Sequence, residues 1–455
     1  LGHAFYKMLI SSSGIRLFDF NNLQNNSLHV VTELTYRNGD EEFRPDITLL
    51  FNGMPLAFIE VKKPNNREGL LAERNRINVR FKNKKFKRFI NISQLLVFSN
   101  NMEYDDDAAT PLQGAFYSST AYNDITFNSF REEEQFDLEK LLKPEDEKLE
   151  NFVLKDNNLS VIKHSPEFLT NKNPNSPTNR VITSLFSSNR FAFLLKFGIA
   201  YLTHKGKTQK HIMRYPQFFA ARAIRQSIEN GTKKGIVWHT QGSGKTALAY
   251  YCVAYLTDYF QKKLIIPKFY FIVDRIDLLI QASTEFTLRG LKVHTVNNKD
   301  ELLRNFREQK AVHNLTGKPE ITVVNIQKFK DEGEILRQTD YNINTQRVYF
   351  LDEVHRSYSP GGSFLANLIN SDRAAILLGL TGTPLIASDR RSRDTFGDYI
   401  HKYYYNASIA DGYTLRLIRE GIETKYKMQL EATLKDLEIL KGEVSREIIY
   451  AHDKF

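Results

Sequence analysis

From residue 212 onward, short apolar runs alternate with segments of helical spacing. Runs of this kind, bounded by polar residues, are typical of strands that are buried on both faces of a sheet. Strands that alternate with helices predict a parallel sheet with right-handed crossovers. Besides a strand that begins at Ile236, we expect strands at 269–273, 321–324, 348–351 and 375–380.

The stretch IVWHTQGSGKTALAY combines the first of these strands with a glycine-rich turn and the start of a helix. Gly242 and Gly244 flank Ser243, so the backbone can bend and bring its N–H groups close to a triphosphate. The helix that begins near Lys245 would point the positive end of its dipole at the same anion. Lys245 would reach the β- and γ-phosphates of this triphosphate, and the Thr246 hydroxyl would ligate Mg²⁺.

His239 stands where the usual phosphate-binding motif has glycine, so the match is to the GxGKT core. A strand-to-helix turn that binds no nucleotide is the alternative interpretation of these residues. Polar motifs also follow the later strands, and in a doubly wound sheet the carboxyl ends of strands form the ligand crevice. These motifs are VDR at 273–275, NIQKF at 325–329, DEVH at 352–355 and TGTP at 381–384.

Asp352 follows a predicted strand and can hold the Mg²⁺ that Thr246 also contacts, while Glu353 is placed to orient or deprotonate the attacking water. A buried acidic turn without function is the alternative. His355 and the turn at 381–383 could relay the nucleotide state, although a lone histidine is more often structural.

The helical segment PQFFAARAIRQSIENG precedes the phosphate loop and ends at a glycine. Gln217, with Arg214 and Tyr215 beside it, could read or stack on adenine. We therefore include these three residues in the predicted nucleotide site.

The first half of the chain contains the hairpin signal RPDITLLFNGMPLAFIEVKK, in which strands at 47–51 and 56–61 flank Asn-Gly. A strict two-residue loop pairs Asp46 with Ile59 and leaves Asp46 and Glu60 on opposite faces. A three-residue loop, or a bulge near Pro55, would return both carboxylates to one face. A metal site here requires that irregularity.

Asp46, Glu60 and Lys62 suit metal-dependent phosphodiester hydrolysis, because carboxylate oxygens hold Mg²⁺ and the metal activates a bound water. Lys62 could position that water or neutralise the transition state. The spacing fits an exposed hairpin with a solvated charged face equally well. Pro45-Asp46 followed by Glu60-Val61-Lys62 resembles the PD-(D/E)xK nuclease signature, and this resemblance favours the metal site.

A basic segment, ERNRINVRFKNKKFKRF, follows the hairpin and is interrupted by phenylalanines. It fits a surface that tracks DNA phosphates and is anchored to the core by its aromatic rings. A solvated basic helix is the alternative. A strand is expected at 94–98, and Gln94 and Glu33 are further candidates for the nuclease site.

Length and composition agree with a protein of two or three domains, since 455 residues exceed one ordinary core. The net charge of +10 favours a polyanionic partner, and the single cysteine, Cys252, suits a cytoplasmic protein. The apolar run at 191–202 is too short for a membrane span, and we expect a buried helix there. Residues 104–179 are acidic and loop-rich, with linker composition at 171–179, and we place a domain boundary there.

The motifs HTQGSGKT, IVDRIDLLIQ, NIQKF, LDEVHRS and GLTGTP, preceded by RPDITLLFNGMPLAFIEVKK, resemble the restriction and translocation subunit of type I restriction–modification enzymes. The resemblance implies an α/β protein in which a PD-(D/E)xK nuclease-like domain, 1–180, precedes a RecA-like P-loop helicase lobe, 181–414. Residues 415–455 would then lead toward a second RecA-like lobe. No equivalent of the Gln-x-x-x-Tyr motif of such nucleases is assigned.

The resemblance further implies ATP-dependent translocation on double-stranded DNA coupled to Mg²⁺-dependent cleavage. The partners would be a methyltransferase (M) and a specificity (S) subunit, and no membrane is expected. A DExH nucleic-acid remodelling ATPase with an inactive or accessory nuclease domain is the alternative. By motif, the nuclease residues are Asp46, Glu60 and Lys62, the phosphate and Mg²⁺ contacts are Lys245 and Thr246, and the hydrolytic pair is Asp352 and Glu353.

Overall fold

The structure is a computed structural model in which two compact units are distinguished, Leu1–Thr414 and Leu415–Phe455. It describes residues 2–11, 14–64, 66, 69–105, 113–120, 124–134, 137–142, 145–296, 301, 319–325, 345–354, 372, 374–383, 396–415 and 424–441. The second unit contains helix α17 (Thr424–Lys441). No helix among the described residues is both long enough and apolar enough to span a bilayer.

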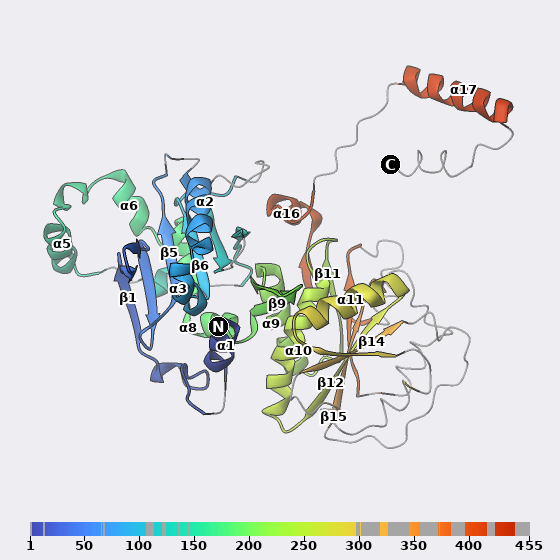
Figure 1. The fold of residues 1–455 in the computed structure, drawn as a ribbon, viewed down its shortest axis with the longest axis horizontal. Helices are drawn as coiled ribbons and strands as arrows, with labels where there is room; N and C mark the ends of the chain where they lie inside the picture. The colour runs from blue at the N-terminus through green and yellow to red at the C-terminus, as the bar shows by residue number, and fades with distance from the viewer. Residues whose placement is uncertain are drawn as a thin grey trace. The chain divides into compact units, whose positions relative to one another are not determined.

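A six-stranded sheet forms the N-terminal part of the first unit (Figure 1). Its order is β1 (Leu28–Thr32), β4 (Ile47–Phe51), β5 (Met54–Val61), β6 (Leu95–Ser99), β7 (Ala115–Ser119) and β8 (Asn128–Ser129). Only the β5–β6 pair is parallel among the pairs of this sheet. The strands expected at 47–51, 56–61 and 94–98 are confirmed, with ends that differ by at most two residues.

Helices and short elements surround this sheet. The crossover from β5 to β6 runs through α2 (Gly69–Lys82), η2 (Lys84–Phe86) and α3 (Lys87–Ile92). Phe81, Phe86 and Phe89 of this crossover are buried in a core with Phe58, as the interruption of the basic segment by aromatic residues predicted. The remaining elements are α1 (Gly2–Leu9), η1 (Leu23–Asn25), and the pair β2 (Tyr36–Asn38) and β3 (Glu41–Phe43).

The β4–β5 hairpin contains the irregularity that is needed to place the Asp46 and Glu60 carboxylates on the same face of the sheet. Phe51 pairs with Met54 across the two-residue turn, and Leu50 pairs with Pro55. Leu49 then pairs with Ala57, so one residue is extra on β5 beside the proline that cannot donate a hydrogen bond. The predicted bulge is therefore confirmed.

The described part of segment 104–179, which we expected to be loop-rich, contains several short helices. It contains α4 (Leu138–Leu141), α5 (Glu147–Asp156), η3 (Ser160–Ile162), α6 (Pro166–Lys172) and α7 (Pro177–Leu185). Proline occupies the first turn of both α6 and α7, where its missing N–H has no cost, and the Ser165 side chain accepts the Phe168 N–H at 3.2 Å. Charged composition had concealed these short helices.

The expectation of one buried helix at 191–202 is wrong in its second half. Helix α8 (Ser188–Phe197) ends at Gly198, and the chain continues as β9 (Ile199–His204). This strand pairs with β10 (Lys207–Ile212) across a turn in which Lys205 and Gly206 both have positive φ. The turn lies beyond the apolar run, so periodicity within the run did not reveal it.

A seven-stranded parallel sheet forms the rest of the first unit, as the alternating pattern predicted. Its order is β13 (Lys292–Val296), β14 (Glu320–Asn325), β12 (Ile266–Val273), β15 (Thr345–Leu351), β16 (Ile376–Thr381), β11 (Lys234–His239) and β17 (Tyr399–Tyr403). Helices α9 (Tyr215–Glu229), α10 (Lys245–Gln261) and α11 (Ile276–Leu288) lie against one face (Figure 1). A short helix, α16 (Tyr405–Ala410), follows β17.

Candidate functional site

The end of β5 brings the three predicted nuclease residues together. Continuing the bulged register from Ile47 and Ile59 places Asp46 opposite Glu60. Asp46 Oδ2 accepts a hydrogen bond from the Val61 N–H at 2.8 Å and lies 4.0 Å from Lys62 Nζ. The hairpin and its bulge thus form a cluster of two carboxylates and one amine.

Glu60 is fully buried and its carboxylate lacks ordinary partners. Neither oxygen accepts a hydrogen bond, and the contact to Arg76 Nη2 is 3.7 Å long. Burial, and then the charges of Glu73 and Asp46, raise the pKa of Glu60 to about 8, against the opposing effect of Lys62 and Arg76. A buried, ionised carboxylate without hydrogen bonds is energetically unfavourable, and a bound divalent cation would stabilise it.

Helix α2 adds residues to this cluster that sequence reasoning did not assign. Glu73 is 3 % exposed, and its oxygens lie 3.0 Å from Lys62 Nζ and 2.5 Å from Arg76 Nη2. Arg80 contacts the Phe43 ring at 4.9 Å, and burial lowers its pKa. The spacing of Glu73, Arg76 and Arg80 is i, i+3, i+7, which places them on one helix face and was the available signal.

Gln94 and Glu33 do not contribute side chains to the cluster. Gln94 is buried at the start of β6, where its amide donates to the Ile92 carbonyl at 2.8 Å. Because β5 and β6 are parallel, this position is level with Leu56 and lies at the opposite end of the strand from Glu60. The Glu33 N–H donates to the Asp46 carbonyl, but its exposed carboxylate pairs with Arg44 at 3.9 Å.

The phosphate loop lies between β11 and α10. Gly242 and Gly244 have φ values of +82° and +87°, which favour glycine, and a Cβ at Gly244 would approach Gln217 Nε2 to 2.5 Å. Lys245 Nζ lies 3.4 Å from the His239 carbonyl oxygen. The Ser243 hydroxyl is buried without a hydrogen-bond partner. The loop therefore has the glycine conformations that the motif predicted.

Two acidic residues at the end of β15 face this loop. Glu353 Oε1 lies 3.7 Å from Lys245 Nζ, and Glu353 Oε2 accepts the Gly382 N–H at 3.5 Å. Burial and the charge of Glu353 raise the pKa of Asp352 to about 6, although Lys245 opposes the increase. Glu353 has a φ of +48°, which is uncommon outside glycine. The ends of three neighbouring strands, β15, β16 and β11, thus meet at one place.

The three residues predicted to contact adenine have different surroundings. Gln217 Nε2 donates to the Gly244 carbonyl at 3.0 Å, and Arg214 Nη1 donates to the Gly242 carbonyl at 3.0 Å. Tyr215 is 2 % exposed and its hydroxyl donates to Asp411 at 2.7 Å. The Tyr215 ring is therefore packed inside the protein, and its contact with adenine stays a prediction.

Several predicted motif residues lie outside the described part of the chain. They are 326–329 of NIQKF, His355 of DEVH and Pro384 of TGTP. Asn325 is buried at the end of β14, and Thr381 Oγ1 donates to the Thr383 carbonyl at 3.0 Å.

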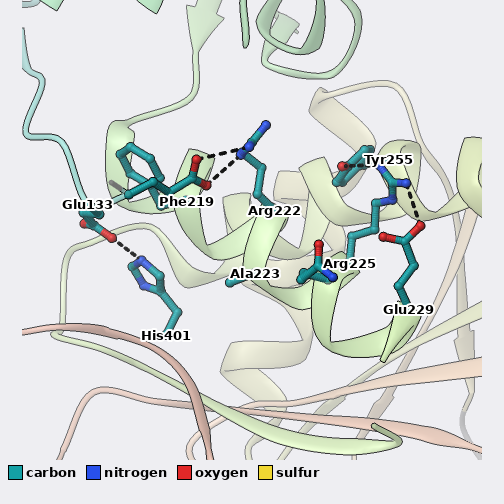
Figure 2. Close-up of a pocket in the computed structure, with 10 residues that line it drawn as sticks. Glu133, Phe219, Arg222, Ala223, Arg225, Glu229, Tyr255 and His401 are labelled. Atoms are coloured by element: carbon teal, nitrogen blue, oxygen red, sulfur yellow. Dashed lines mark hydrogen bonds and ion pairs between the residues drawn. The ribbon is translucent and has the colours of Figure 1, made fainter. Parts of the chain in front are cut away.

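Residues 131–134, which follow β8 of the first sheet, make contacts with α8 and with residues in and after β17 of the second sheet. Arg131 pairs with Asp411, and Glu132 and Glu134 both pair with the buried Arg190. Figure 2 shows Glu133 directed at His401 on one side of a 310 Å³ pocket. These contacts were not predicted, because they join residues more than 50 positions apart.

His401 also contacts the strand that leads into the phosphate loop. Its Nδ1 lies 2.8 Å from His239 Nε2, and burial together with His401 and Lys245 holds the pKa of His239 well below its usual value. In Figure 2 the same pocket is bordered by Arg222 and by Arg225, whose guanidinium donates to Tyr255 and Glu229. The pocket's arginines are therefore already paired with acids or a phenol.

The described ranges contain no group of three or more His, Cys, Asp or Glu side chains that could hold a metal ion. The carboxylate pair Asp46 and Glu60 and the strand-end residue Asp352 are smaller sets that would need water or phosphate oxygens to complete a coordination shell.

Comparisons with known proteins match both parts of the chain. Residues 216–447 match the SWI2/SNF2 ATPase family, and residues 2–105 match the type I restriction enzyme R protein N terminus. A putative type I restriction enzyme endonuclease subunit of Methanocaldococcus jannaschii is 26 % identical over 481 residues, covering 96 % of this chain and 41 % of its own length. A second such protein of the same organism is 24 % identical, with coverages of 90 % and 37 %.

A type I restriction enzyme endonuclease subunit of Haemophilus influenzae is 25 % identical, with coverages of 94 % and 38 %. The chain therefore spans about 37–41 % of the length of these relatives. Among solved structures, a fragment of a putative HsdR subunit of a type I restriction enzyme from Vibrio vulnificus has a TM-score of 0.31 at 15 % identity, covering 84 % of this chain and 56 % of that one.

The sequence matches confirm the resemblance drawn from the motifs. The SWI2/SNF2 match covers about half of the chain and contains the phosphate loop, the DEVH motif and the strand ends described above. The chain belongs to the SWI2/SNF2 ATPase family and carries, ahead of that domain, the N-terminal domain of type I restriction enzyme R proteins.

Proposed function

We propose that this chain joins a Mg²⁺-dependent PD-(D/E)xK nuclease domain to an ATP-driven motor that moves on double-stranded DNA. It would act as part of the restriction subunit of a type I complex, with methyltransferase (M) and specificity (S) subunits. The observation that carries the proposal is Glu60, a fully buried carboxylate without a hydrogen bond, beside Asp46 and Lys62. The proposed domains are 1–180, the nuclease, 181–414, a first RecA-like lobe, and 415–455, a connection toward a second lobe.

The residues of the nuclease cluster fit a divalent cation. Glu60 and Asp46 would be the protein ligands, and a bound Mg²⁺ would lower the pKa of a water and stabilise charge on the phosphate. The Val61 N–H holds Asp46 in place, and Glu73 holds Lys62 beside it. Lys62 would then position the attacking water or neutralise the transition state. Arg76, half exposed next to Glu60, suits a contact with a DNA phosphate.

The residues at the strand ends of the second sheet fit ATP with Mg²⁺. The N–H groups at Gly242, Ser243 and Gly244 would surround the phosphates, with Lys245 as the neutralising cation. Thr246 and Asp352 would hold the metal, and Glu353 would orient the attacking water. Arg214 and Gln217, which already contact loop carbonyls, would lie beside the nucleotide.

Two variants of the full-length protein, assembled with its M and S subunits, test the proposal. Lys62→Ala should abolish cleavage of circular unmethylated DNA and leave ATP hydrolysis intact, because the nuclease chemistry lies outside the motor. Lys245→Ala should remove ATP hydrolysis, and cleavage with it, since cutting at a distance requires translocation.

The results separate the alternatives. Normal cleavage by Lys62→Ala would show that this cluster does not cut the DNA. A nucleic-acid remodelling ATPase with an inactive or accessory nuclease domain would be favoured if the parent complex did not cut and calorimetry with Mn²⁺ found no binding that depends on Glu60. Normal cleavage by Lys245→Ala would show that translocation and cleavage are not coupled.

A further inference from the structure

A second recess lies directly beside the nuclease cluster. It has a volume of about 760 Å³ and is bounded by residues 61–64 after β5, by Ser99 and Asn101 at the end of β6, and by α6 and α7. Figure 1 shows α6 next to β5. Lys62 belongs both to this recess and to the cluster, because its Nζ also contacts Asp46 and Glu73. A ligand in the recess would therefore reach the proposed reaction centre.

Polar contacts join the walls of the recess to one another. The Asn101 amide donates to Asn171 Oδ1 at 3.0 Å, and Asn101 Oδ1 accepts the Thr178 N–H at 3.1 Å. The hydroxyls of Ser99 and Thr178 are 2.6 Å apart. Asn101 has a φ of +58°, a conformation that asparagine tolerates better than most residues. Side-chain hydrogen bonds thus connect both helices to the end of β6.

The lining combines three kinds of chemistry. Lys62 and Lys63 supply positive charge where the recess meets the cluster, and Phe168 of α6 supplies an aromatic ring. Ser176 is 4 % exposed, and its hydroxyl has no hydrogen-bond partner. Glu167, the carboxylate among the lining residues, is exposed in the first turn of α6. The lysines would bind a phosphate, the Phe168 ring would stack on a planar ring, and the Ser176 hydroxyl would bind a polar atom at the edge of that ring.

We propose that this recess, which we call the α6–α7 recess, receives one unpaired nucleotide of the DNA strand that is cut. This inference rests on the proposed nuclease function. The base would stack on Phe168 and meet the Ser176 hydroxyl, and its phosphate would lie near Lys63, while the adjoining phosphate reaches Lys62 and the carboxylates. The volume exceeds what one nucleotide needs and is too small for a duplex, which favours a base that has left its stack.

Binding of short labelled DNA duplexes to the 455-residue chain, followed by fluorescence anisotropy without divalent cations, tests the proposal. One duplex is fully paired and the other has a single unpaired nucleotide. We expect the parent chain to bind the second duplex more tightly, because the cost of unstacking the base is already met. Phe168→Ala should reduce that preference about tenfold, as base–aromatic stacking energies imply.

Phe152→Ala is the matched control, since Phe152 is 67 % exposed on α5 and does not line the recess. It should leave both affinities unchanged. Phe168→Leu, which keeps apolar volume but no aromatic face, guards against a folding defect and should lose the same preference. Lys63→Ala should weaken binding of the duplex with the unpaired nucleotide more than binding of the fully paired one, because the phosphate of that nucleotide would lie near Lys63.

Three results would overturn the inference. They are no preference of the parent for the unpaired nucleotide, an unchanged preference in Phe168→Ala, and displacement of both duplexes to the same extent by free dAMP, which would indicate a site for mononucleotides. None of these outcomes affects the nuclease assignment, which depends on cleavage by the Lys62→Ala complex. A complex in which Lys62→Ala cuts normally would instead remove the basis of both proposals.

Discussion

Replacing Glu60 with glutamine should stabilise the metal-free chain at neutral and alkaline pH. Burial raises the pKa of Glu60 from 4.5 to about 8 in the folded chain, with Glu73 and Asp46 adding to the effect. The folded state therefore binds one more proton than the unfolded state between these two pH values. The stability associated with this group is fully present below pH 4.5 and is lost as the pH rises toward 8.

The size of the effect follows from the pKa. Each pH unit between 4.5 and about 8 lowers the free energy of unfolding by about 1.4 kcal/mol. The loss is therefore about 3 kcal/mol at pH 7 and reaches a limit of about 5 kcal/mol above pH 8. A difference of one unit in the pKa changes this limit by about 1.4 kcal/mol. Glutamine removes the charge at every pH. It also removes the 3.7 Å contact to Arg76, which is half exposed, so that this loss is under about 1 kcal/mol.

Calorimetric melting of the chain in EDTA from pH 4.5 to 9 measures this difference. Glu60→Gln should melt at a higher temperature than the parent at pH 8, and the gap should close toward pH 4.5. Glu73→Gln is the matched control, because Glu73 is equally buried but is paired with Lys62 and Arg76, so its replacement should destabilise the chain. Adding Mg²⁺ at pH 8 should stabilise the parent but not Glu60→Gln. A Glu60→Gln chain that is less stable than the parent at pH 8 without metal would refute the reasoning.

Two further substitutions test the part of the molecule that contains the phosphate loop. Gly244→Ala combines a positive φ with a contact to Gln217, and should lower stability by more than Gly231→Ala, where φ is also positive but the space is open. The excess should be about 1 kcal/mol or more in urea denaturation, and equal losses would contradict the close approach. Glu133→Gln removes the charged partner of His401 and should cost about 1–2 kcal/mol in the same assay, whereas unchanged stability would mean that the pair is not formed in solution.

Local sequence signals predicted the parts of the fold in which one pattern dominates. The four later strands of the parallel sheet are continuous apolar runs, and each was found within a few residues of its place. Strand β17 (Tyr399–Tyr403) carries a histidine and a lysine and pairs at the sheet edge, so its sequence lacks the apolar run of a central strand. Strand β9 was hidden because its apolar residues continue those of α8 without a break.

The nuclease cluster shows where sequence reasoning was sufficient and where it was not. A metal site with Asp46 and Glu60 on one face required a three-residue loop or a bulge near Pro55, and the structure has the bulge, with Leu56 as the extra residue. The partnership of Lys62 with Glu73 depends on how α2 packs across the sheet, which no local pattern encodes. The same holds for Glu133 and His401, whose contact joins positions 268 residues apart.

Both proposed sites contain groups in unfavourable states. Glu60 is a carboxylate without a donor, and the Ser243 hydroxyl is buried without a partner. Glu353 holds a left-handed backbone conformation at the end of a central strand, and the pKa of Asp352 is raised to about 6. Each feature has an energetic cost, and positive charge or polar atoms of a bound group would relieve the cost of the buried carboxylates and of the Ser243 hydroxyl. A ligand that removed these costs would gain the corresponding affinity.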